Sequence, residues 1–512
     1  MKQLDRVQLL TDKYMNDGIK KGDIGHRNLT MLTDFYELTM GGGYFDAGLA
    51  DTVAHFDLFF REVPDGGGFA IMAGLESVID YLSNLHFSSD DIEYLRGRKI
   101  FSEEFLSYLK NFKFACDVWS VPEGTVIFPG EPILRVKGPI IQAQFIETAL
   151  LMFINHQSLI ATKANRIVRA AQGRAVMEFG SRRAQGADAA HYGARAAYIA
   201  GCAGTACTIS DITFGVPALG TMAHSWVQTF DSELDAFKTY AAKYPNACTL
   251  LVDTYNVLKS GIPNAIRAFD EILKPLGIEA GGVRIDSGDI SYLAKKARKM
   301  LNDAGYPDIK IVASNSLDEY IIRELLINNA PVDSFGVGER LITASSSPMF
   351  GGVYKLAAID RPDGNNKNKT IHVPKIKLSE NVSKLTTPGA KSLWRLYDRE
   401  SGKAIADVVT LEDEIIGDSA PYEIFSPRYT WKRKVCENFR ANRILCQIFD
   451  KGNLIYNQPT LTEVRAHCAR SVDTLWDEVT RFENPHEYYV DLSQDLWDLR
   501  DRLIKENSAK YK

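Results

Sequence analysis

Thr249-Leu-Leu-Val-Asp253 is a short apolar run that ends in an acidic residue. Gly282-Val-Arg-Ile-Asp286 has the same pattern, and Ile309-Lys-Ile-Val-Ala-Ser314 and Ser334-Phe-Gly-Val-Gly338 follow at intervals of about 30 residues. The intervals hold segments with helical periodicity, namely Ile262 to Leu273, Ile290 to Ala304 and Leu317 to Asn328. This alternation predicts successive strand–helix units of a parallel sheet.

Two earlier runs extend the series, Ala175-Val-Met-Glu-Phe179 and Pro217-Ala-Leu-Gly220. We therefore predict an α/β fold with an α/β barrel over residues 161–356. Polar residues follow nearly every predicted strand, and the carboxyl ends of the strands are where βα barrels hold their chemistry. Polar residues that only begin loops would explain one or two of these positions, but less well all six.

The segments on either side of the barrel are rich in β-like sequence. The runs are 53–60, 118–121 and 133–136 before it, and 370–373 and 393–397 after it. We expect residues 29–160 and 357–512 to build a second, mostly β domain from both flanks, and residues 1–28 to form an N-terminal arm. The segment Arg361 to Lys369 predicts a mobile loop because it is rich in Asn, Lys and Gly. The charged tail is expected to become helical toward Lys512.

Composition excludes several classes of protein. The chain has 512 residues and a net charge of −5, which leaves no basic footprint for nucleic acid or an anionic membrane. Its seven cysteines are odd in number and include no C-x-x-C pair, so neither a disulfide framework nor a zinc site is expected. No apolar run reaches transmembrane length, and the N-terminus lacks an apolar signal core. These features predict a cytoplasmic protein without a membrane partner.

Gly220-Thr-Met-Ala-His-Ser225 delivers one histidine, His224, just after a predicted strand. An imidazole at that place is suited to nucleophilic or acid–base chemistry. A lone histidine is more often a hydrogen-bonded core residue, so the functional interpretation depends on its neighbours.

Two motifs supply such neighbours. Glu178-Phe-Gly-Ser-Arg-Arg183 offers the flat face of Phe179 and two guanidinium groups, Arg182 and Arg183, although surface ion pairs are the favoured explanation of these arginines taken in isolation. In Arg284-Ile-Asp-Ser-Gly-Asp289, the acids Asp286 and Asp289 could hold Mg²⁺ through water while Arg284 meets phosphate. A helix N-cap by Ser287 or Asp286 is also expected, but it does not account for Arg284.

Two glycine-rich segments complete the predicted rim. Phe335-Gly-Val-Gly338 and Phe350-Gly-Gly-Val-Tyr-Lys355 could present backbone N–H groups to phosphate through Gly336, Gly338, Gly351 and Gly352. Ser314 adds a hydroxyl at the same edge. From the residues alone, the chain is interpreted as performing metal-assisted chemistry on a phosphorylated small molecule with a planar anionic ring.

The motifs resemble those of the nicotinate phosphoribosyltransferases, in the order of that family and over roughly Leu29 to Leu356. They are Leu32-Thr-Asp-Phe-Tyr36, Glu178-Phe-Gly-Ser-Arg-Arg183, Gly220-Thr-Met-Ala-His224, Val252-Asp-Thr-Tyr255, Arg284-Ile-Asp-Ser-Gly-Asp289 and Gly351-Gly-Val-Tyr-Lys355. The resemblance implies the type II phosphoribosyltransferase fold, which is an irregular α/β barrel with a second β domain. It also implies a homodimer with shared active sites.

The reaction implied by the resemblance is displacement of pyrophosphate from phosphoribosyl pyrophosphate by nicotinate, which gives nicotinate mononucleotide for NAD salvage. The substrates would be nicotinate, phosphoribosyl pyrophosphate and ATP, with Mg²⁺ as cofactor. ATP hydrolysis would be coupled to the reaction through phosphorylation of His224.

Residue roles also follow from the resemblance. Tyr36 of the neighbouring subunit and Phe179 would flank the pyridine ring, with Thr221 near the nicotinate. Arg182, Arg183 or Arg284 would meet the carboxylate and the phosphates. Asp286 and Asp289 would organise pyrophosphate and Mg²⁺, directly or through water.

Alternative functions remain open at this point. A nicotinamide-using relative would carry an acid near Gly204-Thr205-Ala206, where this chain has none, and a quinolinate-using relative would be shorter and lack the histidine motif. A non-catalytic sensor on the same scaffold predicts loss of His224 or of the two aspartates, and all three are present. The pair Glu339-Arg340 replaces a small hydroxyl residue expected in many relatives, which bears on how phosphate is held near Gly338.

Overall fold

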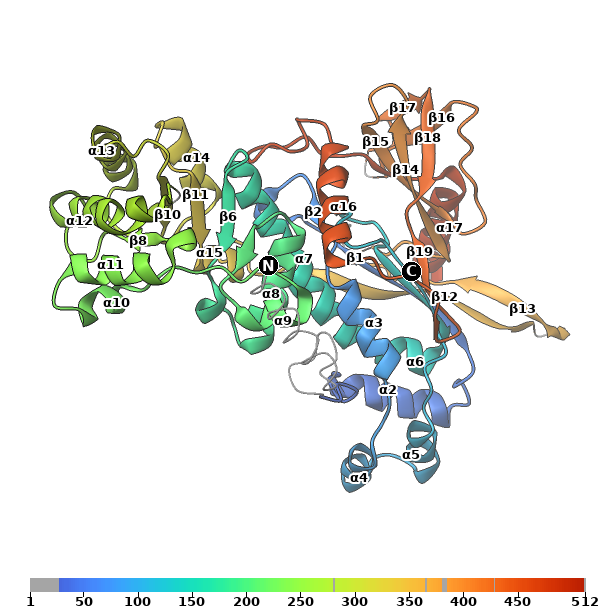
Figure 1. Cartoon of the computed structure of the whole chain (residues 1–512). Helices are drawn as coiled ribbons and strands as arrows, with labels where there is room; N and C mark the ends of the chain where they lie inside the picture. Colours follow the sequence, from blue (N-terminus) through green and yellow to red (C-terminus); the bar gives the residue numbers. More distant parts are fainter. Residues whose placement is uncertain (1–26, 280, 364–365, 380–384, 428, 511–512) are drawn as a thin grey trace. The chain divides into compact units, whose positions relative to one another are not determined.

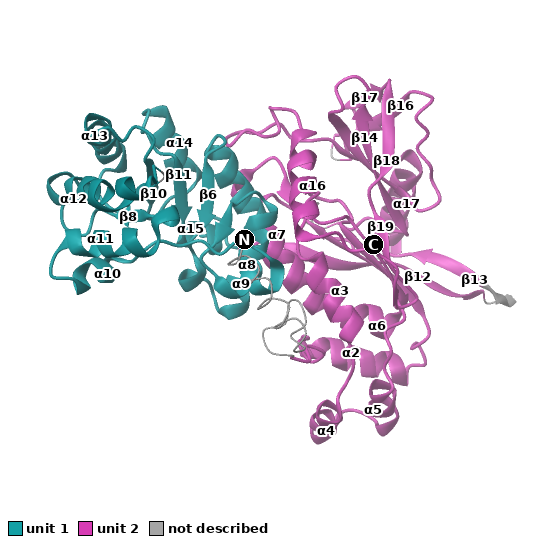
Figure 2. Ribbon diagram, viewed as in Figure 1, with its two compact units in different colours: residues 1–21, 160–348 teal, residues 22–159, 349–512 magenta. Residues whose placement is uncertain are grey.

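The computed structural model describes residues 27–510 except 280, 364–365, 380–384 and 428. These residues form two compact units (Figure 2), one of residues 160–348 and the other of the residues up to 159 together with those from 349 onward. Residues 349–356, which were predicted to be part of the barrel, belong to the second unit. The predicted arm, residues 1–28, lies almost wholly outside the described residues.

The first unit contains a six-stranded parallel sheet in the order β7-β6-β11-β10-β9-β8. Figure 1 labels β6, β8, β10 and β11 of this sheet. The strands are β6 (Ala175–Glu178), β7 (Gly204–Thr205), β8 (Thr249–Leu251), β9 (Gly282–Ile285), β10 (Lys310–Ser314) and β11 (Ser334–Val337). In β10, Val312 pairs with Arg284 of β9 on one side and with Ser334 of β11 on the other. The predicted strand–helix series is therefore confirmed, because β8 to β11 lie side by side in chain order.

Helices cover this sheet because its strands are apolar on both faces, as parallel sheets require. They are α8 (Ala187–Ile199), α9 (Thr208–Phe214), α10 (His224–Thr229), α11 (Glu233–Lys243), α12 (Ile262–Ala268), α13 (Ile290–Asp303), α14 (Glu319–Ile327) and α15 (Glu339–Ile342). Helix α13 buries Ala294, Ala297 and Leu301, which share one face at helical spacing. The predicted helix Ile262 to Leu273 is α12 up to Ala268 and a π-helical turn, Phe269–Leu273, after it.

Closure of the sheet into a barrel is not confirmed. Among the described residues, β7 and β8 are the two ends of the sheet and do not pair with each other. The predicted strand Pro217 to Gly220 is reduced to an isolated parallel bridge between Ala218 and Thr205 of β7. This bridge places the segment that leads to His224 alongside the β7 edge.

The second unit is built from both flanks, as predicted. Its largest sheet has the order β13-β12-β1-β5-β3-β19-β20. The strands are β1 (Val53–Phe60), β3 (Asp117–Ser120), β5 (Leu134–Pro139), β12 (Gly352–Asp363), β13 (Asn366–Pro374), β19 (Cys446–Asp450) and β20 (Asn453–Leu454). In β1, Leu58 pairs with Tyr354 of β12 on one side and with Leu134 of β5 on the other. Strands that precede and follow the first unit in sequence thus share one sheet.

Three smaller sheets and a set of helices complete the second unit. The smaller sheets contain β2 (Ala70–Ile71), β4 (Val126–Ile127), β14 (Lys391–Asp398), β15 (Ala404–Leu411), β16 (Tyr422–Phe425), β17 (Arg433–Cys436), β18 (Phe439–Arg443) and β21 (Val490–Leu492). The helices are α2 (Phe35–Asp46), α3 (Leu75–Asn84), α4 (Ser89–Gly97), α5 (Glu103–Lys110), α6 (Ile140–Phe145), α16 (Leu461–Asp473) and α17 (Gln494–Lys510), and α7 (Glu147–Ala170) runs on into the first unit.

The loop predicted for Arg361 to Lys369 is wrong in part. The structure gives most of this segment to the ends of β12 and β13, with residues 364–365 outside the described part. Pairing with the neighbouring strand outweighs the polar, glycine-containing composition that indicated a loop. Within the described residues, no helix is both long and apolar enough to cross a membrane.

Candidate active site

Polar side chains meet at the carboxyl ends of β8, β9 and β10 in the first unit. The members of this rim cluster are Thr221, His224, Asp253, Arg284, Asp286, Ser287 and Ser314, and each of them hydrogen-bonds at least one other member. The parallel register explains the meeting, because carboxyl ends of neighbouring parallel strands lie at the same edge of a sheet.

His224 is the first residue of α10, and its Nε2 lies 3.1 Å from Oδ1 of Asp253. The imidazole is 41% exposed, whereas the Asp253 carboxylate is 1% exposed. A buried carboxylate against one ring nitrogen orients the imidazole and leaves the other nitrogen, Nδ1, without that partner. The imidazole of His224 is therefore oriented by Asp253 and accessible to solvent, so His224 is not a buried core histidine.

Asp253 also holds the loop that follows β9. Its Oδ2 accepts hydrogen bonds from the backbone N–H of Asp286 at 3.0 Å and from Oγ of Ser287 at 2.6 Å. One buried carboxylate thus fixes His224 and the Asp286 loop at the same time. Asp253 was predicted as a strand end and as part of the Val252-Asp-Thr-Tyr255 motif, but no role was predicted for its side chain, although an acid at that position was the available signal.

Arg284 is the main hydrogen-bond donor of the cluster. Its Nε donates to Ser314 Oγ at 2.8 Å, and its two terminal nitrogens donate to Thr221 Oγ1 at 3.2 Å and to Asp286 Oδ1 at 2.8 Å. Ser314 also donates to Asp286. The guanidinium is 16% exposed, so it presents a fixed positive charge at the rim.

Phe179 packs beside this cation, with the Arg284 guanidinium carbon 5.7 Å from the ring centre. A Cβ added to Gly336 would come within 2.7 Å of the Phe179 ring, so only glycine leaves the ring in this position. Gly336 lies inside β11 and not in an open turn. The structure therefore gives Gly336 a packing role under Phe179, while phosphate contact by Gly336 stays a prediction.

The segment that carries Phe179 is anchored by Glu178, whose carboxylate is fully buried. Glu178 accepts hydrogen bonds from Gly180 N–H and from Thr205 Oγ1, the latter at 2.5 Å. Burial raises the pKa of Glu178. Beyond this anchor, Arg182 and Arg183 lie exposed on a short 3₁₀ helix, and their roles toward a ligand stay predictions.

The backbone directly after Ser314 adopts an unusual conformation. Asn315 and Ser316 have φ values of 85° and 47°, a region that residues other than glycine seldom occupy. Such conformations cost of order 1–3 kcal/mol each and are found preferentially at functional sites. The turn after β10 therefore carries backbone strain directly next to Ser314 of the rim cluster.

The two aspartates predicted to hold Mg²⁺ differ in their present roles. Asp286 Oδ1 is engaged by Arg284 and Ser314, while Asp289 is exposed and caps α13 through the N–H of Tyr292 at 3.0 Å. Carboxylate oxygens are the ligands that Mg²⁺ prefers, so the donor set fits this ion. The prediction that Ser287 or Asp286 caps the helix is wrong, because the N-cap of α13 is Asp289, three residues after Asp286.

The remaining predicted residues take places away from the rim cluster. Gly338 precedes α15, and the Arg340 that follows it is paired with Asp318, the N-cap of α14. This ion pair therefore links α15 to the start of α14.

Tyr36, Gly351 and Gly352 belong to the second unit, so their roles toward the rim cluster stay predictions. Tyr36 is 44% exposed at the start of α2, and burial of its hydroxyl end, followed by the charge of Glu147, raises its pKa. Gly352 begins β12, and its N–H donates to Asn155 Oδ1 at 3.0 Å.

Comparison with known proteins gives consistent matches along the chain. The N-terminal domain, the family proper and the C-terminal domain of nicotinate phosphoribosyltransferase match residues 31–155, 174–388 and 390–500. The chain is 42% identical to nicotinate phosphoribosyltransferase of Bacillus subtilis over 485 residues, which cover 94% of this chain and 96% of that protein. It is 33% identical to nicotinate phosphoribosyltransferase of Caenorhabditis elegans, over 93% of this chain and 94% of that protein.

Solved structures agree with this result. The crystal structure of human nicotinic acid phosphoribosyltransferase matches with a TM-score of 0.80 and 30% identity, over 92% of this chain and 99% of that one. A nicotinate-nucleotide pyrophosphorylase from Pyrococcus furiosus matches with a TM-score of 0.65 and 23% identity, over 89% and 98% of the two chains, and shares the fold.

Proposed function

Because the chain belongs to the nicotinate phosphoribosyltransferase family, we propose that it couples the transfer of a phosphoribosyl group to nicotinate, in NAD salvage, to hydrolysis of ATP through a phosphorylated His224. The observation that carries the proposal is the 3.1 Å pair between His224 and Asp253. It provides an exposed nucleophile on a buried, negatively charged support. The family assignment argues against the three alternatives, which are a nicotinamide-using enzyme, a quinolinate-using enzyme and a non-catalytic sensor.

The geometry favours one ring nitrogen as the nucleophile. When Nε2–H donates to Asp253, the lone pair of the neutral imidazole is on Nδ1. Nδ1 would attack the γ-phosphorus of ATP, the bond to the bridging oxygen would break, and ADP would leave. Asp253 stabilises the positive charge that develops on the ring during this attack. Water would later cleave the P–N bond and release phosphate.

The transfer step is assigned to the rest of the rim cluster. The pyridine nitrogen of nicotinate attacks C1 of the ribose while the C1–O bond to pyrophosphate breaks, so positive charge develops on the ribose and negative charge on the leaving group. Arg284 would meet the negative charge, and its three hydrogen bonds to side chains support this role because they fix its guanidinium. The face of Phe179 would stack on the pyridine ring. Arg182 or Arg183 would pair with the carboxylate of nicotinate.

Phosphorylation of His224 would change the electrostatics of this rim. A phosphoryl group adds nearly two negative charges and three acceptor oxygens. On His224 these charges would lie close to Asp253 and the Asp286 loop, because Asp253 binds both. The change would alter the affinity for pyrophosphate and its precursor, which is how ATP hydrolysis would drive product formation.

Mg²⁺ is assigned to Asp286 and Asp289, directly or through water. When bound, the ion would neutralise charge on the pyrophosphate group. Asp286 is held in place by Arg284 and Ser314, whereas Asp289 is an exposed helix cap. Gly338 and Gly351 are proposed to offer backbone N–H groups to phosphates, whereas a phosphate at Gly352 would have to replace Asn155 Oδ1 as the acceptor of its N–H.

We further propose a homodimer in which Tyr36 of the partner subunit covers the pyridine ring. The exposure of Tyr36 at the start of α2 supports this, since an aromatic side chain that is 44% exposed is available to another chain. Its neighbour Phe35 is 40% exposed on the same helix start.

The test is nucleotide formation from phosphoribosyl pyrophosphate and Mg²⁺ with nicotinate, nicotinamide or quinolinate, each with and without ATP. We expect nicotinate to react, ATP to raise its turnover, and the His224→Ala variant to lose only the increase due to ATP. Label from γ-labelled ATP should appear on the wild-type protein and be absent from the variant.

The matched control is His86→Ala, which removes another exposed histidine, one whose Nδ1 contacts the carbonyl of Asn84. This variant should keep both the label and the ATP effect. Persistence of the label in His224→Ala, or nicotinate turnover that ATP does not change in the wild type, would contradict the phosphohistidine proposal.

A further inference from the structure

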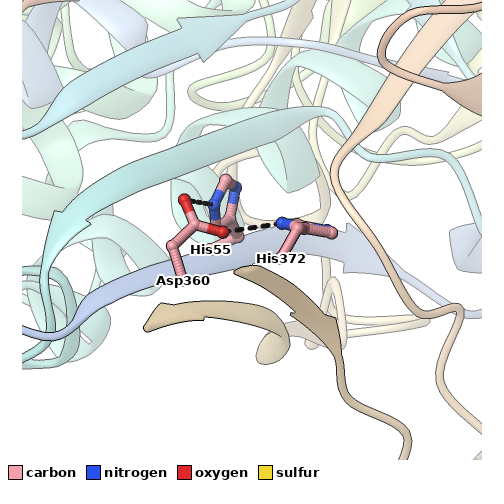
Figure 3. Close-up of side chains that lie close together, drawn as sticks. All are labelled: His55, Asp360 and His372. Carbon is pink, nitrogen blue, oxygen red and sulfur yellow. Dashed lines mark hydrogen bonds and ion pairs between the residues drawn. The ribbon is translucent and has the colours of Figure 1, made fainter. Parts of the chain in front are cut away.

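A second cluster of titratable side chains lies in the second unit and contains no residue of the rim cluster. His55, Asp360 and His372 come from three neighbouring strands of the large sheet, β1, β12 and β13, and their side chains converge on one point (Figure 3). His55 lies beside Ala358 of β12, and Asp360 lies directly opposite His372 in the β12–β13 pairing. Rigid strand pairing therefore sets the positions of all three residues.

The ligand atoms are already close together. His55 Nε2 is 3.0 Å from Asp360 Oδ2, and His372 Nδ1 is 2.7 Å from Asp360 Oδ1. One nitrogen from each histidine and one oxygen from the aspartate all lie within 4.8 Å of one another. Zinc–nitrogen and zinc–oxygen bonds of about 2.0–2.2 Å hold ligand atoms within roughly 4.4 Å of one another, so a small movement of the side chains would bring all three atoms to one ion.

The surroundings leave room for an ion with water ligands. The three residues line a pocket of about 480 Å³, with Thr370, Glu412 and Asp413 elsewhere on its wall. Exposure rises across the cluster, from 2% for His55 through 15% for Asp360 to 40% for His372. The cluster thus has a buried base and an open side through which an ion can enter.

We propose that His55, Asp360 and His372 bind a divalent first-row transition metal ion of the zinc class. Two imidazoles and one carboxylate suit Zn²⁺, Co²⁺ or Fe²⁺, whereas Mg²⁺ and Ca²⁺ prefer oxygen ligands alone. The site is therefore distinct in chemistry from the carboxylate site assigned to Mg²⁺. The open side of the pocket supplies the remaining coordination positions from water.

Binding would replace the protons that now join each histidine to Asp360, so those protons would be released. The backbone N–H of Ala390 lies 3.4 Å from Nε2 of His372, and an ion on Nδ1 would place a proton on Nε2 and end this contact. A contact at that distance is at the weak limit of hydrogen bonding, so its loss costs little. Lys137, which also lines the pocket, opposes the ion, while Asp360 and Asp413 favour it.

The ion would tie three strands together. β13 is the edge strand of the sheet, so it has a paired neighbour, β12, on one side only. A metal bridge from His372 of β13 to His55 of β1 would link the edge strand to the strand beyond its neighbour. The proposed role is therefore to fix the β12–β13 hairpin on the sheet.

The experiment measures Zn²⁺ and Co²⁺ bound per chain after gel filtration of the full-length protein, together with titration calorimetry and the visible spectrum of Co²⁺. We expect one ion per chain, and the d–d spectrum of bound Co²⁺ should indicate a low coordination number. His372→Asn and Asp360→Asn should each weaken binding at least tenfold, because even partners of ligands cost that much when lost. His55→Asn should also weaken binding at least tenfold, but this variant alters a buried residue.

The matched control is His86→Asn, which removes an exposed histidine elsewhere in the second unit and should bind as the wild type does. Far-UV circular dichroism and nicotinate turnover should be unchanged in His372→Asn, the most exposed ligand. Wild-type affinity and stoichiometry in both His372→Asn and Asp360→Asn would overturn the proposal. That outcome would leave the cluster as a hydrogen-bonded link between strands, and it would not touch the function proposed for His224.

Discussion

Asp253 fixes His224 through one contact, in which Oδ1 of Asp253 lies 3.1 Å from Nε2 of His224. The carboxylate is buried, whereas the imidazole is partly exposed. The other oxygen of Asp253 holds the Asp286 loop. A change in the charge of His224 therefore acts, through the shared carboxylate of Asp253, on the loop that is assigned to pyrophosphate.

Asp253→Asn should keep much of this geometry but remove the charge that supports a cationic imidazole. We expect the rate of phosphorylation from ATP to fall by about 10² to 10⁴-fold, since general acid–base partners contribute that much. Single-turnover labelling with γ-labelled ATP measures it. Asp303→Asn, at an exposed ion pair with Lys299, is the control. Equal labelling rates in the two variants would remove the role given to Asp253.

Arg284→Lys should weaken phosphoribosyl pyrophosphate binding although it keeps the positive charge. The guanidinium makes three directed hydrogen bonds, and an ammonium group cannot satisfy all three acceptors from one point. We expect KM for phosphoribosyl pyrophosphate to rise about 10- to 100-fold, which corresponds to roughly 1.5–3 kcal/mol. Arg298→Lys, which alters an arginine bound to Asp333 and Pro307, should leave KM unchanged.

Gly336→Ala should displace Phe179, because the new methyl group would lie 2.7 Å from its ring. We expect KM for nicotinate to rise about tenfold and the free energy of unfolding to fall by about 1–3 kcal/mol. Steady-state kinetics and urea unfolding measure the two effects. Gly97→Ala, where an added Cβ meets nothing within 4 Å, should change neither. Normal nicotinate kinetics in Gly336→Ala would mean that Phe179 does not contact the ring.

Ala206→Asp should shift the ring preference from acid to amide. Ala206 follows β7, is exposed, and is held by a hydrogen bond from its N–H to the Glu178 carbonyl. A carboxylate there would repel the nicotinate carboxylate and accept a hydrogen bond from an amide. We expect kcat/KM for nicotinate to fall about tenfold or more and that for nicotinamide to rise. In Ala206→Asn, which lacks the charge, kcat/KM for nicotinate should fall less.

Glu37 should make stability depend on pH. Burial raises the pKa of this carboxyl from 4.5 to about 7, although hydrogen bonds from Thr33 and Thr148 oppose the shift. Between these two values the folded chain binds more protons than the unfolded chain, so the free energy of unfolding falls as pH rises through about 4.5 to 7. The loss attributable to Glu37 is no more than about 3 kcal/mol.

Urea unfolding at pH 5 and pH 7.5 tests this pH dependence. Glu37→Gln should show a smaller loss of stability between the two pH values than the wild type, because its side chain does not ionise. Glu104→Gln, at an exposed position on α5, should follow the wild type. An unchanged pH dependence in Glu37→Gln would show that Glu37 is ionised throughout.

Much of the fold was determined by sequence pattern alone. The runs that end at Asp253, Asp286, Ser314 and Gly338 are apolar because strands of a parallel sheet are covered on both faces, and their order along the chain is also their order in the sheet. The same pattern placed Arg284 and His224 at one edge, since carboxyl ends of parallel strands coincide. Local periodicity is enough for such inferences because each strand–helix unit packs against its neighbour in sequence.

Only the tertiary structure decided which residues touch. The pairing of β1 with β12 joins residues about 300 positions apart, and no local pattern encodes such a contact. The choice of Asp253 as the partner of His224, the packing of Gly336 under Phe179 and the meeting of His55 with His372 all depend on register and side-chain direction. Sequence determined which chemical groups stand at strand ends and in strands, whereas long-range packing, through burial and pairing, determined which of them act together.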